Sequence, residues 1–178
     1  MVIFIFKFYK VTDNKKYILS AVVAEKKLRR MALEIAERNY NEPQLILIGI
    51  KDHGTVIAKK ISDYLKTNFK GEVIVLEMGI DKKHPAAVTL SQAMDFNGKV
   101  IILIDDVANS GRVMLYAIKP LLEQYPKKIQ TLALVERTHK AFPVAVDYIG
   151  ISVSTTLDEH IYVEVENDTV SGAWIEED

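Results

Sequence analysis

Apolar runs without a charged residue, separated by stretches of helical periodicity, are the feature that most constrains the fold of this chain. Three such runs are LILIGI (45–50), VIILI (100–104) and LALV (132–135). A continuous apolar run of this length is typical of a β-strand that is buried on both faces of a sheet. From Leu28 to Ile35, apolar residues recur instead at intervals of three and four, which is the spacing of an amphipathic helix. The alternation of strands and helices predicts an α/β fold with a mostly parallel, doubly wound sheet flanked by helices.

The remaining elements are predicted from the same patterns. Helices are expected over residues 20–39, 54–70 and 113–122. Pro120 should kink or shorten the last of them. Further strands are expected at EVIVLEM (72–78), VDYIGI (146–151), HIYVEV (160–165) and GAWIEE (172–177). The polar, aperiodic stretch 79–99 is expected to be a flexible loop and a candidate lid.

The N-terminal segment, residues 1–17, is expected to be an extension or an extra strand. Phe4, Phe6 and Phe8 occupy every second position, which would place all three on one face of a strand. Such a strand could be buried in the core or used at a dimer interface, and the pattern leaves both open. Lys7 interrupts the apolar run too early for a secretory signal, so we expect a cytoplasmic protein.

Composition excludes several classes of function. The 178 residues suit one domain, cysteine is absent, and the four histidines are scattered. This excludes disulfides, thiol catalysis and clusters of thiolate or histidine metal ligands. No apolar run approaches the ~20 residues of a membrane-spanning helix. The 23 basic side chains are balanced by 24 acidic ones, so no global positive field would steer the protein onto nucleic acid.

The segment IDDVANSGR (104–112) has the most distinctive chemistry. Asp105 and Asp106 follow an apolar strand, and small residues lead through Ser110 and Gly111 into a predicted helix. Backbone N–H groups at such a helix start bind anions, and a glycine allows a phosphate to approach closely. The acids could then accept hydrogen bonds from sugar hydroxyls, so a ribose 5-phosphate fits this turn. Two alternatives stay open on the turn alone: a capped helix start, and a phosphoryl-accepting aspartate as in receiver domains.

This segment resembles the signature by which type I phosphoribosyltransferases bind phosphoribosyl pyrophosphate (PRPP): an apolar strand, two acids, then Ser or Thr and Gly. The likeness runs from about Ile18 to the C-terminus and includes LILIGIKDHGTVIAKKI (45–61) and LALVERTHKAFPVAVDYIGISVSTT (132–156). It favours the branch of bifunctional pyrimidine-operon attenuators and uracil phosphoribosyltransferases. The resemblance implies a doubly wound sheet with a small hood region. It also implies an enzyme that transfers the phosphoribosyl group of PRPP to a nucleobase.

The resemblance further implies roles for individual residues. Asp105 and Asp106 would be the catalytic pair, binding the ribose 2′- and 3′-hydroxyls. The 5′-phosphate would be held by a loop of five residues, Val107, Ala108, Asn109, Ser110 and Gly111. The pyrophosphate loop, which in the family commonly contains a strained peptide and a basic side chain, would be Lys51, Asp52, His53 and Gly54. The branch usually has Thr-Arg where this chain has Asp52-His53, so Lys51 would supply most of the positive charge.

Two more segments would complete the implied site. The stretch 79–99 corresponds to a flexible loop over the active site, and its basic side chains are Lys82, Lys83 and His84. The base pocket would be bordered by Arg137 and His139 and covered by Ile161 and Tyr162. Solvated or structural roles for these side chains stay open as alternatives.

The implied reaction separates charge, because departure of pyrophosphate leaves positive charge on the ribose and negative charge on the leaving group. Catalysis would therefore be electrostatic and positional. Mg²⁺ suits this chemistry when it arrives with PRPP, because it then needs few protein ligands. Asp106 could also take or hold the proton of the attacking base. Uracil is the expected base, because the likeness around VERTHKAFPVAVDYIG (135–150) favours the pyrimidine branch of the family. Glu136 stands where purine-salvage relatives often present a lysine to the purine's exocyclic oxygen, and a charged acid cannot donate there, which should handicap purines more than uracil.

Two non-enzymatic functions stay open: a regulator that binds nucleotide and RNA, and a nucleotide sensor without turnover. The first predicted helix has a basic cluster consisting of Lys26, Lys27, Arg29 and Arg30. Leu28 interrupts this cluster and Glu34 follows it, which is typical of a solvated, ion-paired face. RNA binding is therefore expected to be weak. A homodimer and no membrane partner are expected.

Overall fold

A six-stranded sheet forms the centre of the fold. The computed structural model describes residues 15–81, 84–85, 87–156 and 158–177. In spatial order the strands are β4 (Val88–Leu90), β3 (Glu72–Ile80), β2 (Gln44–Ile50), β5 (Val100–Ala108), β6 (Lys128–Arg137) and β7 (Tyr148–Val153). The edge strand β4 is antiparallel to β3, and the other neighbours pair in parallel. The chain builds outward from β2 in one direction and from β5 in the other, which confirms the doubly wound sheet. Ligands bind such sheets at the carboxyl ends of the strands beside this reversal.

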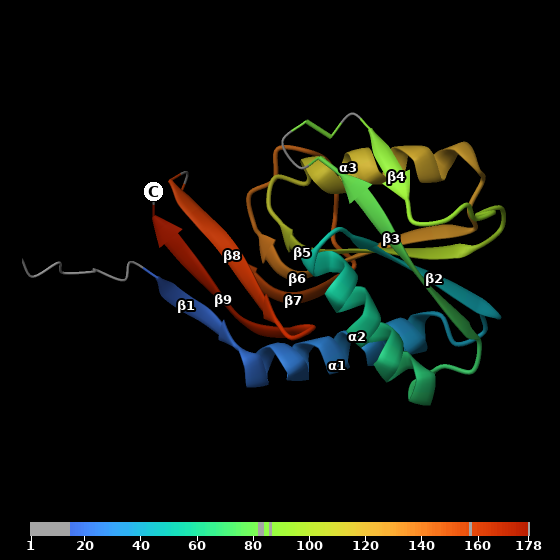
Figure 1. Ribbon diagram of the computed structural model, residues 1–178, viewed down its shortest axis with the longest axis horizontal. Helices are drawn as coiled ribbons and strands as arrows, with labels where there is room; N and C mark the ends of the chain where they lie inside the picture. The colour runs from blue at the N-terminus through green and yellow to red at the C-terminus, as the bar shows by residue number, and fades with distance from the viewer. Residues whose placement is uncertain (1–14, 82–83, 86, 157, 178) are drawn as a thin grey trace, which may run out of the picture.

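Helices cover both faces of this sheet (Figure 1). The helices α1 (Ala21–Arg38) and α2 (His53–Asn68) lie on one face, and α3 (Arg112–Ile118) lies on the other. Ser20 caps α1, because its Oγ accepts the Val23 N–H at 3.4 Å. After α3 the chain continues as the 3₁₀ helix η1 (Lys119–Glu123), with Pro120 near its start. The predicted shortening of the helix at this proline is thereby confirmed.

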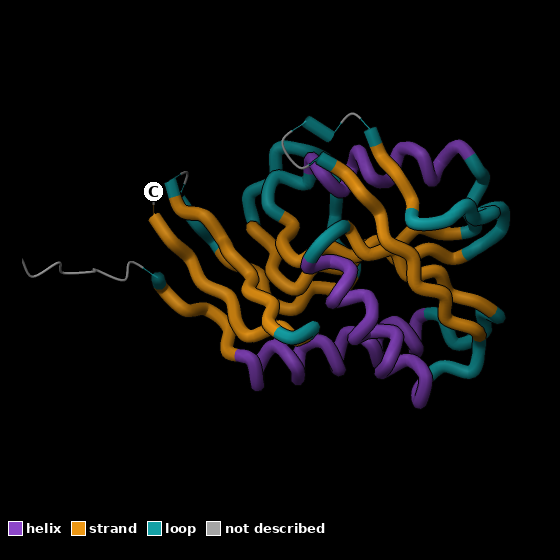
Figure 2. The backbone as a smooth tube through the Cα atoms, in the orientation of Figure 1, coloured by secondary structure: helices purple, strands orange, loops and turns teal. Residues whose placement is uncertain are grey.

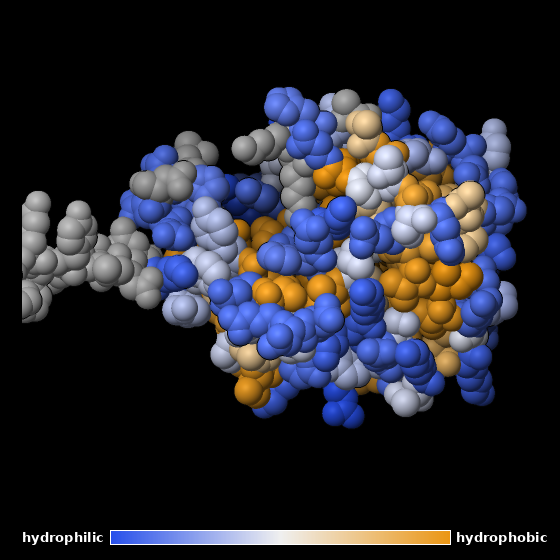
Figure 3. All heavy atoms as spheres, viewed as in Figure 1, coloured by the Kyte–Doolittle hydropathy of each residue, from blue (hydrophilic) through white to orange (hydrophobic). Residues whose placement is uncertain are grey.

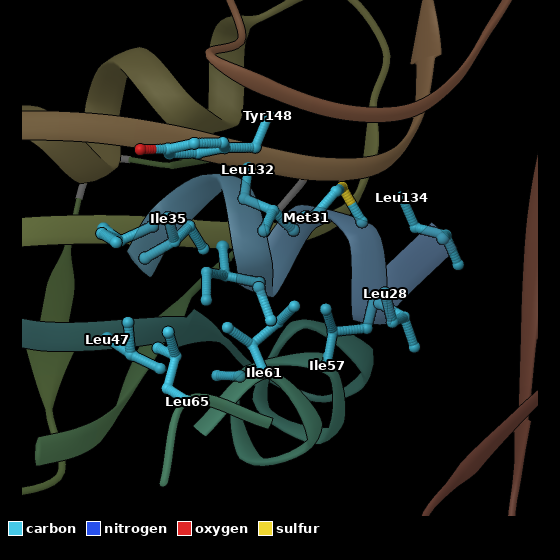
Figure 4. Packing of buried hydrophobic residues seen from close by; sticks show 14 of the residues in the cluster. Leu28, Met31, Ile35, Leu47, Ile57, Ile61, Leu65, Leu132, Leu134 and Tyr148 are labelled. Carbon is cyan, nitrogen blue, oxygen red and sulfur yellow. The ribbon is translucent and has the colours of Figure 1, made fainter. Parts of the chain in front are cut away.

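The apolar run of β2 is buried on both faces, as its composition predicts. Leu45 and Leu47 belong to a cluster shared with α1 and α2, whereas Ile46 and Ile48 belong to a second cluster on the α3 side. Figure 4 shows the first cluster, in which side chains of α1 and α2 meet those of the strands. Successive strand residues point to opposite faces, so one continuous apolar run supplies both layers of the core.

A second, antiparallel sheet stands near the carboxyl ends of the parallel strands, and we call it the hood (Figures 1 and 2). Its strands in spatial order are β1 (Lys16–Ser20), β9 (Thr169–Glu177) and β8 (Glu159–Glu166). Tyr17 pairs with Trp174, which pairs with Tyr162 on its other side. The Trp174 ring lies 6.0 Å from the Tyr17 ring and 5.8 Å from the Tyr162 ring, between centroids. Aromatic cross-strand pairs of this kind stabilise an antiparallel sheet.

Residues 1–17 are predicted to be an extension or an extra strand, and the last two of them belong to a strand of the hood. Lys16 and Tyr17 belong to β1, because their backbone pairs with Ile175 and Trp174 of β9. The signal for this strand is weak in the sequence, since its pairing partner lies at the opposite end of the chain. The predicted alternation of phenylalanines at residues 4–8 lies outside the described residues.

The stretch 79–99 also differs from the predicted loop. Strand β3 continues to Ile80, and residues Val88–Leu90 return as β4, pairing Ile80 with Val88 and Met78 with Leu90. Val88 and Leu90 pack against the core cluster on the α3 side, which explains why this polar stretch contains a strand. Of the basic residues expected here, Lys82 and Lys83 lie outside the described residues.

Hydrophilic residues cover most of the face of the molecule in Figure 3, with hydrophobic patches between them. In the part of the chain that the structure describes, no helix has the length and apolar character needed to cross a membrane.

Candidate functional site

The carboxyl end of β5 carries the two adjacent acids. The sequence predicts that the strand stops before Asp105, but β5 continues to Ala108, because β6 pairs with it from Val100 to Asp105 and again at Val107 and Ala108. Strand β2 pairs with β5 only as far as Ile104. Asp105 and Asp106 therefore lie beyond the part of β5 that pairs with β2. Asp105 and Asp106 are nonetheless only 2% and 8% exposed.

The two acids are held by local hydrogen bonds. The Asp106 N–H donates to Asp105 Oδ1 at 3.0 Å. On the other carboxylate, Asp106 Oδ2 lies 3.1 Å from Nδ1 of His53, the first residue of α2. A carboxylate only accepts hydrogen bonds, and it has about four acceptor positions. The pair therefore presents oxygen acceptors at the switch point of the sheet.

The loop after β5 is tied down by backbone bonds. The Ser110 carbonyl accepts the N–H groups of Ala141 and Phe142 at 3.1 and 3.0 Å. Gly111 has a φ of 80°, and a Cβ there would lie 3.1 Å from the Phe142 carbonyl oxygen. Both the backbone conformation and the close approach therefore favour glycine at this position.

The same loop encloses a small hollow. Its volume is about 50 Å³, and its lining runs along the backbone from Val107 to Met114, with Asp105 at one end. Ser110 Oγ accepts the Arg112 N–H at 3.4 Å, so it satisfies one backbone donor at the start of α3, although the N-cap residue is Gly111. A hydroxyl oxygen that accepts this bond can still donate its own proton to a ligand.

The segment before α2 lies beside the acids. Lys51 and Asp52 are exposed, and the peptide bond between them is cis. The Lys51 N–H donates to the Met78 carbonyl at 2.9 Å, which anchors the segment to β3. Helix α2 begins at His53, one residue before the predicted start. Of the four residues expected here, the structure thus brings His53 to the acid pair and leaves Lys51 and Asp52 at the surface.

Gly54 decides how closely α2 approaches β5. A Cβ at Gly54 would lie 2.7 Å from the Ile104 carbonyl oxygen and 3.3 Å from the Asp105 Cα. Both neighbouring atoms belong to the backbone of the central strand, so neither can move aside cheaply. The absence of a side chain at Gly54 therefore places His53 within reach of Asp106.

The segment after β6 contains a partly buried charged cluster. Lys140 Nζ donates to Glu136 Oε1, and Ser152 Oγ donates to Glu136 Oε2 at 3.1 Å. The Glu136 and Lys140 side chains are only 13% and 14% exposed. Sequence reasoning singled out Glu136 but did not predict its contacts with Lys140 and Ser152, because neither spacing belongs to a recognised motif.

The four residues expected at the base pocket do not form one group. Arg137 contacts the loop after β5 through Asn109, with its Nη1 donating to Asn109 Oδ1 at 3.1 Å. His139 is exposed. Ile161 packs against the core cluster of α1 and α2, whereas Tyr162 is 41% exposed and stacks on Trp174. Adjacent strand residues point to opposite faces, so Ile161 and Tyr162 cannot both cover one base.

Comparisons with known proteins show which family this chain resembles and which structures share its fold. The phosphoribosyl transferase domain model matches residues 16–167. The chain is 33% identical over 163 residues to the bifunctional protein PyrR of Ligilactobacillus salivarius, covering 85% of this chain and 92% of that protein. It is 33% identical over 156 residues to the pyrimidine operon regulatory protein of Lactococcus lactis, covering 85% and 90%. A hypoxanthine-guanine phosphoribosyltransferase structure from Bacillus anthracis superposes with a TM-score of 0.72 at 16% identity, covering 89% and 96%.

Replacing Gly54 with alanine tests the approach of α2 to β5. Alanine favours a helix over glycine by up to about 1 kcal/mol, but here its Cβ would meet the β5 backbone. We therefore expect Gly54→Ala to lower the free energy of unfolding by about 1–3 kcal/mol in urea denaturation, and to shift the NMR signals of the His53 ring. Lys59→Ala, at an exposed position of the same helix, should change stability by less than about 0.5 kcal/mol. Unchanged stability and His53 signals in Gly54→Ala would contradict the packing argument.

Proposed function

The chain belongs to the phosphoribosyl transferase domain family, and on this premise we propose that it transfers the 5-phosphoribosyl group of PRPP to uracil and releases pyrophosphate. The observation that carries the proposal is the acid pair Asp105 and Asp106 at the end of β5, followed directly by the loop with the small hollow. A sugar phosphate needs both features side by side: acceptors for its hydroxyls and donors for its phosphate.

In this proposal the two halves of the ribose phosphate bind to adjacent parts of one segment. Asp105 and Asp106 accept hydrogen bonds from the 2′- and 3′-hydroxyls. The 5′-phosphate occupies the segment from Val107 to Gly111, at the end of β5 and in the loop after it, where backbone N–H groups and the Ser110 hydroxyl donate to it. Because the two acids precede the donor residues along the chain, the acids can stay off the phosphate.

The pyrophosphate would lie over the segment before α2. The Lys51 ammonium supplies positive charge, and His53 lies between this segment and Asp106. Uracil N1 attacks C1′ while the bond from C1′ to the pyrophosphate oxygen breaks and its electron pair leaves with pyrophosphate. The N1 proton needs an acceptor, and the Asp106 carboxylate is the group that we assign to it.

The family reaction uses Mg²⁺, and the acceptor chemistry of the site fits an ion that arrives with PRPP. Within the described ranges there is no group of three histidine, aspartate or glutamate side chains that could hold a metal ion. Asp105 and Asp106 are oxygen donors, as Mg²⁺ prefers, and an ion that keeps substrate and water oxygens needs few protein ligands. When bound, Mg²⁺ neutralises charge on the leaving pyrophosphate.

The choice of uracil rests on the relatives and on Glu136. The relatives at 33% identity are named for the pyrimidine operon or as PyrR, whereas the purine enzyme at 16% identity shares only the fold. Glu136 is held by Lys140 and Ser152, so its carboxylate has no proton to donate to a purine's exocyclic oxygen.

Neutralising the acid pair tests the proposed PRPP site. Asp105→Asn with Asp106→Asn should weaken PRPP binding at least about tenfold, since hydrogen bonds to charged groups contribute about 1.5–3 kcal/mol each. The measurement is a calorimetric titration with PRPP and Mg²⁺, with far-UV circular dichroism to establish folding. Asp63→Asn, on the exposed side of α2, is the control and should bind as the unaltered protein does. Unchanged PRPP affinity in the folded double variant would reject the assignment.

A product assay across nucleobases tests the choice of base. We expect uracil to be used with PRPP and Mg²⁺ at least about tenfold faster than hypoxanthine or guanine, because leaving a buried polar group unpaired costs about 1–3 kcal/mol. Adenine and orotate complete the panel. Faster turnover with a purine would overturn the pyrimidine assignment, and no turnover with any base would favour a nucleotide sensor.

A regulatory function is the second candidate, because a relative is named a pyrimidine operon regulatory protein. The basic cluster of α1 is partly engaged within the fold: Arg30 bonds to Glu34 and to the Ile149 carbonyl. We therefore expect weak RNA binding that falls steeply with salt in a filter-binding titration. Tight, sequence-specific binding at physiological salt that changes with uridine nucleotides would instead establish the regulator. The expected homodimer stays a prediction.

A further inference from the structure

Arg137 joins two segments that the proposed reaction needs in a fixed relation. It is the last residue of β6 and pairs in register with Val153 of β7. Its Nη1 donates to Asn109 Oδ1 at 3.1 Å, and its Nη2 donates to the Thr156 carbonyl. Asn109 lies in the loop after β5, and Thr156 lies between β7 and β8, just before the hood. One guanidinium therefore bridges the proposed phosphate loop and the entrance to the hood.

No negatively charged side chain among the described residues contacts the Arg137 guanidinium. Arginine stays protonated in proteins, yet both of its hydrogen-bond acceptors are neutral oxygens. No carboxylate among the described residues forms an ion pair with Arg137. Its buried Nε has no hydrogen-bond partner within the same part of the chain. A buried donor without a partner costs free energy, so this placement needs a reason other than the stability of the fold.

Each anchor of the guanidinium has independent support. The phosphate loop is fixed a second time by the bonds from Ala141 and Phe142 to the Ser110 carbonyl. At the hood entrance, the Thr156 N–H donates to Glu159 Oε2 at 2.7 Å, and Glu159 is the first residue of β8. A change in Arg137 therefore leaves the loop in place but releases the hood entrance from it.

We propose that Arg137 is a positioning residue that couples the phosphate loop to the hood, so that a nucleotide's phosphate and base are bound as one unit. This inference rests on the proposed function and goes beyond the base-pocket role that the sequence resemblance implies for Arg137. The planar guanidinium reaches both oxygens at fixed angles, whereas a lysine at this position keeps the charge but presents a single flexible donor centre.

Two ligands separate coupling from simple phosphate binding. Ribose 5-phosphate would contact the acids and the phosphate loop only. Uridine 5′-monophosphate (UMP) carries a base as well, and so would also occupy the base side of the site. For Arg137→Lys we expect the Kd of ribose 5-phosphate to stay within about threefold and the Kd of UMP to rise about tenfold, the size of one charged hydrogen bond. Arg38→Lys is the matched control, since Arg38 also donates to a carbonyl, that of Asp147, at the other end of β7. It should leave both values unchanged.

A double-mutant cycle tests whether the effect passes through Asn109. Asn109→Ala should raise the Kd of UMP. Adding Arg137→Lys to Asn109→Ala should raise that Kd by less than a further factor of two, because the link is already broken. Independent, multiplying effects of the two changes would overturn the coupling. Equal weakening of ribose 5-phosphate and UMP in Arg137→Lys would also overturn it, because Arg137 would then serve the phosphate alone.

Amide hydrogen exchange tests the link without any ligand, and so separates it from the proposed function. Arg137→Lys and Asn109→Ala should both increase the exchange rate of the Thr156 amide at least about tenfold, whereas Arg38→Lys should not. Unchanged exchange in both variants would reject the link even if UMP binds. Faster exchange in a protein that binds neither ribose 5-phosphate nor UMP would reject the proposed function and the nucleotide role, while leaving the physical link between loop and hood in place.

Discussion

The parallel pairing of β5 with β6 is the interaction on which the site depends. It continues to Ala108, four residues beyond the last pairing of β5 with β2, at Ile104. Because of this overhang, Asp105 and Asp106 lie in a strand that pairs with β6 on one side and faces α2 on the other. Acids on a rigid strand keep their positions better than acids on a free loop would.

Close backbone packing then sets the distances around the acids. Gly54 lets α2 lie directly against the Ile104 carbonyl. Gly111 lets the loop after β5 pass close to the Phe142 carbonyl. These two contacts come from opposite sides of the sheet, since α2 and α3 cover opposite faces. The site is thus built where two helices begin beside one central strand, as expected for a doubly wound sheet.

Charge is arranged locally rather than globally in this protein. A net charge of −1 gives little long-range attraction for anions, so phosphate groups must be bound by nearby donors. Arg137 lies between the loop and the hood and bonds to neutral partners. Lys140, by contrast, is paired with Glu136, the residue before Arg137. Two basic side chains at and just after the end of β6 therefore differ: among the described residues Arg137 forms no ion pair, whereas Lys140 pairs with Glu136.

The sequence by itself determined the five parallel strands of the central sheet and the segment that carries the chemistry, because both are local patterns, whereas it did not indicate the edge strand β4. Burial of β2 on two faces can be read from its apolar run, and the acids, Ser110 and Gly111 lie within a few consecutive residues. Tertiary structure alone decided which distant residues meet: His53 with Asp106 across 53 positions, and Arg137 with Asn109 across 28. It also placed Ile161 and Tyr162 on opposite faces of the hood. Such contacts depend on strand register and helix approach, which are set by packing between segments and have no signature within either segment.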